Sequence, residues 1–192
     1  IWPYWYSFPQ TSQEMVDAGF ARIKELWTPI FDVFDECDVK FALEVHPTEI
    51  AFDYYSTAKL LEVFDRRPTL GLNFDPSHLV WQGVNPCVFL RDFADRVYHV
   101  HMKDVKVTLD GRAGILGSHI EFGDTRRGWN FVSLGHGNVD FDGIIRELNQ
   151  MGTKLMVSVW PQVSLKSENF REMDEEGFLA RLTDYTEGSI EP

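Results

Sequence analysis

The sequence predicts an α/β fold in which parallel strands alternate with outer helices, and two observations support this prediction. Short apolar runs begin at residues 41, 69, 97 and 154, so the first three runs start 28 residues apart. Stretches with the apolar spacing of a helix follow the first two runs. Strands that alternate with helices form a parallel sheet, because each parallel connection crosses over through a helix.

The first helix is expected near the N-terminus. Thr11 and Glu14 have the spacing of a capping box, in which side chains satisfy free N–H groups at the start of a helix. Pro29 interrupts the pattern that follows, and we expect it to kink or divide the helix, because proline has no N–H to donate. Apolar residues recur every three or four positions and share one face: Val16, Phe20, Ile23, Trp27, Ile30 and Phe34.

The other elements follow in alternation along the chain. Residues 105–139 separate the third apolar run from the next helix and are expected to form one long loop, a length that is usually functional in compact domains. The expected strands are 41–46, 69–75, 97–104 and 154–160, and the expected later helices are 56–66, 86–96, 141–151 and 173–185.

Four strand–helix units make about half of an eight-stranded barrel, which needs about 250 residues. An open doubly wound sheet is the competing architecture. The expected strands end in polar residues, and barrel enzymes build their sites at that edge, which favours a partial (β/α)8 TIM barrel, roughly its C-terminal half. We expect residues 1–192 to form a single domain that lacks the N-terminal strands of a complete barrel. The open edges of such a sheet favour pairing into a homo-oligomer.

Composition narrows the function classes. The chain has 192 residues, of which 44% are apolar, and a net charge of −12. So acidic a surface repels phosphate backbones, which argues against a nucleic-acid partner. No apolar run reaches the roughly 18 residues of a membrane span. Cys37 and Cys87 are too few for a disulfide framework, so we expect two small buried side chains in a reducing compartment, the cytoplasm.

Three successive strand ends carry acids and histidines. Glu44, Asp75 and His101 each lie in or just after an apolar run. A carboxylate placed there is unfavourable by several kcal/mol unless it is paired or bound to a cation. If the strands lie side by side, these three side chains converge on one point. Mixed oxygen and nitrogen ligands suit one divalent metal ion such as Mn²⁺, Co²⁺, Mg²⁺ or Zn²⁺.

The motifs around these residues resemble those of a known family. Glu-Val-His-Pro at 44–47, Asp-Pro-Ser-His at 75–78 and His-Met-Lys-Asp at 101–104 look like the sugar phosphate isomerase/epimerase superfamily, the xylose-isomerase-like TIM barrels. Arg127-Gly-Trp and Gly-His-Gly-Asn-Val-Asp-Phe at 135–141 also match. The resemblance covers about residue 2 to residue 183.

The resemblance implies roles for individual residues. It places one divalent ion on Glu44, Asp75 and His101, with Glu44 also exchanging protons with the substrate. Four further residues match substrate-binding or pocket positions: His46, His78, Lys103 and Arg127. The implied activity is a metal-dependent isomerase or epimerase acting on a sugar, a sugar phosphate or a polyol-derived ketone. The reaction would run through a metal-stabilised enediolate or a hydride shift.

One departure from the family pattern supports an alternative. The family's last strand carries a second glutamate, but this chain has Val159 at that position, followed by Trp160. Neither side chain binds a metal ion or accepts a proton. The alternative is therefore a non-catalytic relative that binds a sugar-like ligand or a partner subunit. Acids beyond that strand, such as Glu168 or Asp174, are the remaining candidates for the missing role.

Overall fold

The computed structural model describes residues 10–117, 120–153 and 170–176. The chain divides into two compact units, residues 1–154 and 155–192, and the second contributes helix α6 (Phe170–Glu175). The expected strand that contains Val159 lies outside the described residues, as does most of the helix expected at 173–185. A single domain over the whole chain therefore stays a prediction.

A parallel three-stranded sheet forms the centre of the first unit. Its strands are β1 (Phe41–Glu44), β2 (Leu70–Phe74) and β3 (Val97–Val100), in the order β1-β2-β3. Glu44 at the end of β1 pairs with Asn73 of β2. The parallel arrangement predicted from the spacing of the runs is confirmed, and it brings the carboxyl ends of neighbouring strands to one edge.

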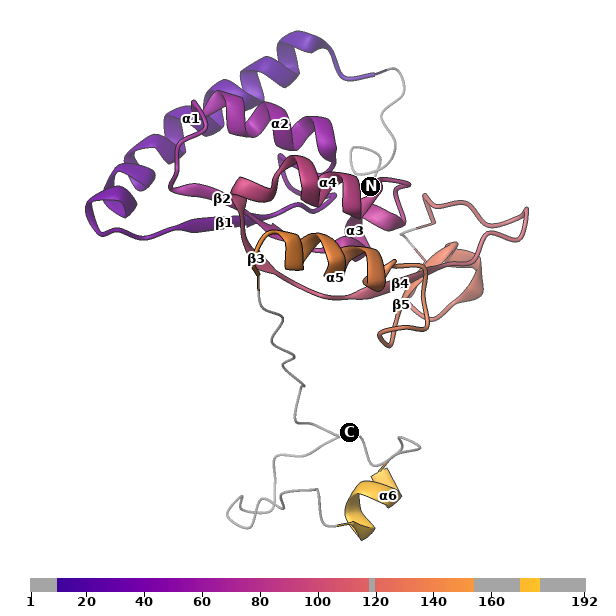
Figure 1. Cartoon of the computed structure of the whole chain (residues 1–192). Coiled ribbons are helices and arrows are strands. Elements are labelled where there is room, and N and C mark those ends of the chain that lie inside the picture. The colour runs from indigo at the N-terminus through magenta and orange to yellow at the C-terminus, as the bar shows by residue number, and fades with distance from the viewer. Residues whose placement is uncertain (1–9, 118–119, 154–169, 177–192) are drawn as a thin grey trace, which may run out of the picture. The chain divides into compact units, whose positions relative to one another are not determined.

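Helices connect these strands. Figure 1 shows α1 and α2 lying together on one side of β1 and β2. The helix expected at 86–96 is divided, because α4 ends at Asp92 and a separate 3₁₀ turn covers Ala94–Arg96. The helices of this unit are α1 (Gln13–Glu36), α2 (Tyr54–Val63), α3 (Pro76–Val80), α4 (Pro86–Asp92) and α5 (Phe141–Gln150).

Helix α1 differs from the expected helix at its N-cap and is not divided at Pro29. Its N-cap is Ser12, whose hydroxyl oxygen accepts the N–H of Met15 at 3.3 Å, so the capping position expected at Thr11 is wrong by one residue. Pro29 lies inside the helix without dividing it. The buried rings of Phe20 and Phe31 flank the proline, and burial of apolar rings outweighs the one backbone hydrogen bond that proline removes.

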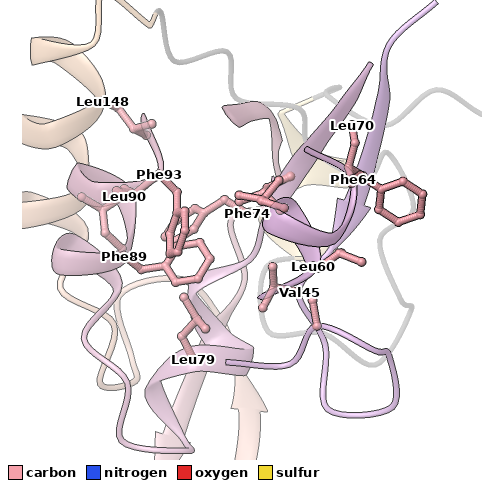
Figure 2. Close-up of a cluster of buried hydrophobic side chains, with 14 of the residues drawn as sticks. Val45, Leu60, Phe64, Leu70, Phe74, Leu79, Phe89, Leu90, Phe93 and Leu148 are labelled. Atoms are coloured by element: carbon pink, nitrogen blue, oxygen red, sulfur yellow. The ribbon is translucent and has the colours of Figure 1, made fainter. Parts of the chain in front are cut away.

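The core lies between the sheet and the helices that follow it. Figure 2 shows Phe74 of β2 beside Phe89 of α4 and Phe93, which follows that helix, and the ring centroids of Phe74 and Phe89 are 6.1 Å apart. Phe89 and Phe93 lie 4.7 Å apart. A second contact joins α1 to the end of α2, where Phe31 meets Phe64 edge-on at 5.1 Å. These rings fix the position of β2, whose five residues are all buried.

The segment 105–139 is not one long loop. Two strands, β4 (Asp104–Val107) and β5 (Trp129–Val132), pair with each other in antiparallel orientation. A 3₁₀ turn (Thr125–Arg127) precedes β5. Asp104 therefore begins a new strand and does not end the third, which stops at Val100. Four-residue strands that pair across more than twenty residues leave little periodicity in a sequence. We call β4, β5 and the residues between them the insertion.

Two further expectations concern cysteines and membranes. Cys37 follows the last turn of α1 and is exposed, so its predicted burial is wrong, whereas Cys87 in α4 is partly buried. Among the helices in the described ranges, none combines the length and hydropathy that a bilayer crossing needs.

Candidate functional site

Three donor groups meet at the carboxyl edge of the sheet. Glu44 ends β1, Asp75 follows β2 directly, and His78 lies in α3. One ligand atom from each lies within 4.8 Å of the other two. Asp75 is also the N-cap of α3, where its Oδ1 accepts the N–H of Ser77 at 3.0 Å. The first turn of this helix brings His78 Nε2 back to 3.6 Å from Asp75 Oδ2.

The Lys103 side chain lies among these three donors. Its Nζ is 2.7 Å from Asp75 Oδ2, 3.2 Å from His78 Nε2 and 3.5 Å from Glu44 Oε1. The sequence placed Lys103 in the pocket wall. We call Glu44, Asp75 and His78 the donor cluster. The structure places the ammonium group of Lys103 between these three side chains.

His101 lies beside this cluster but is not one of the three mutually close donors. Its Nδ1 is 3.3 Å from Glu44 Oε1. Among the described residues, His78 is the third of the mutually close donors. The role of His101 as a metal ligand stays a prediction. The sequence also missed Asn73, whose side-chain nitrogen is 3.2 Å from His101 Nδ1. The available signal was a lone amide in the otherwise apolar run Leu-Gly-Leu-Asn-Phe.

The surroundings shift the pKa values of the three donors in different directions. Burial raises the pKa of Asp75, although Lys103 and Ser77 oppose the shift. Burial acts in the same direction on Glu44, but hydrogen bonding by His101 and the charge of Lys103 together lower the pKa of that carboxyl below its ordinary value. Burial and the neighbouring His46 and Lys103 lower the pKa of His78 to about 4. A neutral imidazole has a free lone pair, which a metal ligand requires.

Lys103 is held in its charged form. Burial lowers the pKa of its amine, but the hydrogen bond and charge of Asp75, together with the charge of Glu44, more than reverse this and raise the pKa above its ordinary value. A positively charged side chain therefore lies among the three donors at neutral pH.

Two aromatic groups border the cluster. The His46 ring packs edge-on against His78 with centroids 4.1 Å apart, and His46 Nδ1 is 2.9 Å from the hydroxyl of Thr48. Phe131 of β5 packs edge-on against His78 at 5.7 Å, and Lys103 Nζ lies 5.5 Å from the centre of the same ring. Phe131 is 38% exposed, so part of its ring remains open to a ligand. The sequence did not single out Phe131.

Arg127 lies in the insertion and is not part of the donor cluster. Its guanidinium carbon is 3.9 Å from the ring centre of Phe122 and 4.4 Å from that of Trp129. Its Nη1 donates to the carbonyl oxygen of Ile120. Trp129 stacks in turn on Trp81 with centroids 4.7 Å apart. The structure thus places Arg127 between aromatic rings, where it stabilises the insertion, and its predicted contact with substrate stays a prediction.

Asp104, the last residue of the His-Met-Lys-Asp motif, organises the turn after β5. Its carboxylate accepts the N–H groups of Gly135 at 2.9 Å, Gly137 at 2.8 Å and Val139 at 3.2 Å. A Cβ on Gly137 would lie 2.2 Å from Asp104 Oδ1, so only glycine permits this approach. Asp104 is a structural residue that ties the start of β4 to the turn after β5.

Comparison with known proteins gives the family. Residues 5–176 match the family described as xylose isomerase-like TIM barrel. The chain belongs to this family. The resemblance and the partial barrel predicted from the motifs are therefore confirmed.

Relatives of the xylose isomerase-like barrel include enzymes. The chain is 26% identical to the uncharacterized protein YfiH of Bacillus subtilis (strain 168) over 91% of its own length and 55% of that protein. It is 32% identical to the inosose dehydratase of Clostridium botulinum (strain Eklund 17B / Type B) over 90 residues, 47% of this chain and 29% of that one. The chain thus spans about half or less of these relatives.

Solved structures share the barrel fold. The crystal structure described as the probable 3-DHS dehydratase AsbF from Bacillus anthracis has a TM-score of 0.55 and 24% identity, and the match covers 76% of this chain and 50% of AsbF. The IolI protein, whose structure contains a bound zinc atom, has a TM-score of 0.52 and 20% identity, with 76% and 47% covered. At these identities the likeness establishes the fold.

Proposed function

We propose that this protein is a divalent-cation-dependent isomerase or epimerase that removes a proton from the carbon next to the carbonyl group of a sugar or a polyol-derived ketone. The observation that supports this most is the donor cluster: two carboxylates and a neutral imidazole, each with an atom within 4.8 Å of the others, at the edge where barrel enzymes act.

The donor cluster fits a divalent ion. The Asp75 side chain is fully buried, and its Oδ2 accepts no hydrogen bond of good geometry from the described residues, although the Lys103 ammonium is 2.7 Å away. A buried carboxylate oxygen of this kind is stabilised by a cation. Two oxygen donors and one imidazole nitrogen suit Mn²⁺, Co²⁺, Zn²⁺ or Mg²⁺. Glu44, Asp75 and His78 would hold the ion, with His101 next to Glu44.

The bound ion would supply positive charge that stabilises the oxygen of the deprotonated substrate. Glu44 is the proposed proton acceptor, because its pKa is held below the ordinary value and its side chain is about one-third exposed. Return of this proton by Glu44 to the former carbonyl carbon, with transfer of the adjacent hydroxyl proton to the former carbonyl oxygen, yields the isomer. Return to the opposite face would need a second acid, and the position expected for it, Val159, lies outside the described residues.

The residues around the cluster favour a polyhydroxylated substrate. Phe131 offers a part-exposed ring next to His78, suited to the C–H groups of a sugar, while Lys103 and His46 supply polar groups for hydroxyls. The N–H groups of Gly135 and Gly137, which could otherwise hold a phosphate, already donate to Asp104. We therefore propose a substrate without a phosphate group.

Dehydration is a second candidate, favoured by the relatives named inosose dehydratase. The first step is the same proton removal by Glu44. The electron pair left on that carbon then expels the hydroxyl group of the adjacent carbon, which leaves as water with the proton supplied by an acid. An inosose-like cyclic ketone would be the substrate class.

Solvent exchange tests the proposal directly. The chelator-treated chain, reloaded with Mn²⁺, would be incubated in D₂O with ketoses and an inosose, the substrates would be separated from the metal, and deuterium next to the carbonyl would be measured by mass spectrometry and NMR. We expect incorporation that needs the ion and disappears in Glu44→Gln, but persists in Glu49→Gln, a nearby exposed glutamate. Isomer and dehydrated product distinguish the two reactions. Ion binding with no exchange on any substrate would instead support the non-catalytic alternative.

A further inference from the structure

The Lys103 ammonium lies at the position that suits a cation in the donor cluster. Its Nζ is 2.7 Å from Asp75 Oδ2, 3.5 Å from Glu44 Oε1 and 3.2 Å from His78 Nε2. It thus touches all three groups that would hold the ion. A divalent ion that these same three atoms bind would occupy the space where the ammonium now lies. The two cannot be there together, because their like charges would repel strongly at so short a distance.

The chain holds Lys103 within reach of this position. The next residue, Asp104, is buried and accepts the N–H groups of Gly135 and Gly137, which fixes the backbone at the base of the lysine. The lysine side chain itself is 44% exposed, so its flexible stem can move while its base stays in place.

A second resting place for the ammonium lies close by. Its Nζ is 5.5 Å from the centre of the Phe131 ring, within the range of a cation–π contact. Phe131 is also the part-exposed ring proposed to contact the substrate. A small movement of the lysine away from Asp75 therefore carries the ammonium from the donor cluster toward the substrate side.

We propose that Lys103 and the divalent ion exchange at one cation position: the ammonium neutralises Glu44 and Asp75 when no ion is bound, and the ion displaces it toward Phe131, where it donates to a substrate oxygen. This inference rests on the proposed function. Lys103 then competes with the ion for one position. It contacts the substrate only after the ion has bound, so the ion binds before the substrate.

Calorimetric titration with Mn²⁺ tests the exchange. The chelator-treated wild type would be compared with Lys103→Met, which keeps the length of the side chain but removes the charge. Lys106→Met makes the same change at an exposed site on β4 and serves as control. We expect Lys103→Met to bind Mn²⁺ at least about tenfold more tightly than the wild type, an effect of one neutralised charge pair, and Lys106→Met to match the wild type.

The outcomes separate this inference from the proposed function. Tighter binding of Mn²⁺ by Lys103→Met than by the wild type supports the exchange. If the wild type binds no Mn²⁺ at all, binding by Lys103→Met still supports the exchange, but the proposal of a metal-dependent activity for the native chain would end. Equal or weaker binding by Lys103→Met overturns the exchange while a metal-binding wild type keeps the proposed function. Binding by neither protein overturns both.

Amine labelling tests the same movement in the wild type and does not depend on a variant that folds. Acetic anhydride would be applied with and without Mn²⁺, and the modification of each lysine would be measured by peptide mass spectrometry. We expect Mn²⁺ to increase the labelling of Lys103 several-fold and to leave Lys106 unchanged, because the ammonium leaves its ion pair. Unchanged or decreased labelling of Lys103 in the Mn²⁺-bound protein would contradict the exchange.

Discussion

Two buried aspartates at strand ends show how this fold separates structure from function. Asp75 is 1% exposed and follows β2, and Asp104 is 2% exposed and begins β4. Asp104 satisfies its carboxylate with backbone N–H groups from Val105, Gly135, Gly137 and Val139. Asp75 directs one oxygen to Ser77 and the other to a lysine ammonium.

The difference lies in what can be exchanged. Backbone N–H groups are part of the chain and cannot leave, so Asp104 is permanently satisfied and holds the insertion together. A lysine side chain can leave, and the oxygen that it contacts then becomes available to another cation. Burial alone therefore does not identify a functional carboxylate, whereas burial next to a displaceable partner does.

The largest expected effect on stability is at Asp104. In Asp104→Asn, the amide NH₂ would face two of the backbone N–H groups that now donate to the carboxylate. These buried N–H groups would lose their acceptor. We expect a loss of about 3 kcal/mol in the free energy of unfolding, measured by urea denaturation. Asp142→Asn, at an exposed position in α5, should change it by about 0.5 kcal/mol or less. An equally small effect at Asp104 would contradict its structural role.

The next effect is a pH dependence that belongs to the donor cluster. His78 has a folded pKa of about 4, below its ordinary value, so the unfolded chain binds the proton more readily. Its contribution is fully present above about pH 6.5 and is lost as the pH falls toward 4. For the chelator-treated protein, we expect this group to lower stability by roughly 2 kcal/mol between pH 7 and pH 5.

The pH effect should disappear from one variant only. Urea denaturation at both pH values would compare the wild type with His78→Gln and with His136→Gln, which changes an exposed histidine. The drop between pH 7 and pH 5 should be roughly 2 kcal/mol smaller in His78→Gln and unchanged in His136→Gln. The same drop in all three proteins would mean that His78 is protonated in the folded state at pH 5.

Arg127 gives a smaller effect. Its planar group lies against the rings of Phe122 and Trp129, and a lysine ammonium cannot stack in the same way. We expect Arg127→Lys to lower the free energy of unfolding by about 1 kcal/mol and to leave Mn²⁺ affinity unchanged. A variant with wild-type stability but weakened sugar binding would instead support the substrate contact that the sequence predicted.

The smallest effect on stability is expected at Asp75. Because burial raises its pKa, the ionised carboxylate is disfavoured in the folded state, and a neutral amide can still cap α3. Asp75→Asn should therefore change the free energy of unfolding of the chelator-treated protein by less than about 1 kcal/mol. A loss as large as that expected for Asp104→Asn would remove the distinction between the two aspartates.

The sequence predicted the parts of this molecule that depend on local pattern. The runs around Phe41–Glu44 and Leu70–Phe74 appear as parallel strands, and the polar ends at Glu44 and Asp75 meet as expected, because adjacent parallel strands end at the same edge. The start of α5 at Phe141 was also predicted correctly.

What the sequence could not predict depends on contacts between distant residues. His78 lies close to both Glu44 and Asp75 because Asp75 starts a short helix immediately, a turn that strand alternation does not include. The position of Lys103 follows from the anchoring of Asp104 by Gly135 and Gly137, more than thirty residues away. The β4–β5 pair likewise forms only through long-range pairing.

The most direct test of the central claim is calorimetric titration of the chelator-treated chain with Mn²⁺, with Glu44→Ala, Asp75→Asn and the exposed-site control Glu49→Ala alongside. Our account predicts one ion per chain in the wild type and in Glu49→Ala, and a loss of binding of about 100-fold or more in Asp75→Asn and Glu44→Ala. A folded wild-type chain that binds no divalent ion, or an Asp75→Asn chain that binds it as well as the wild type, would contradict the claim that the donor cluster is a metal site.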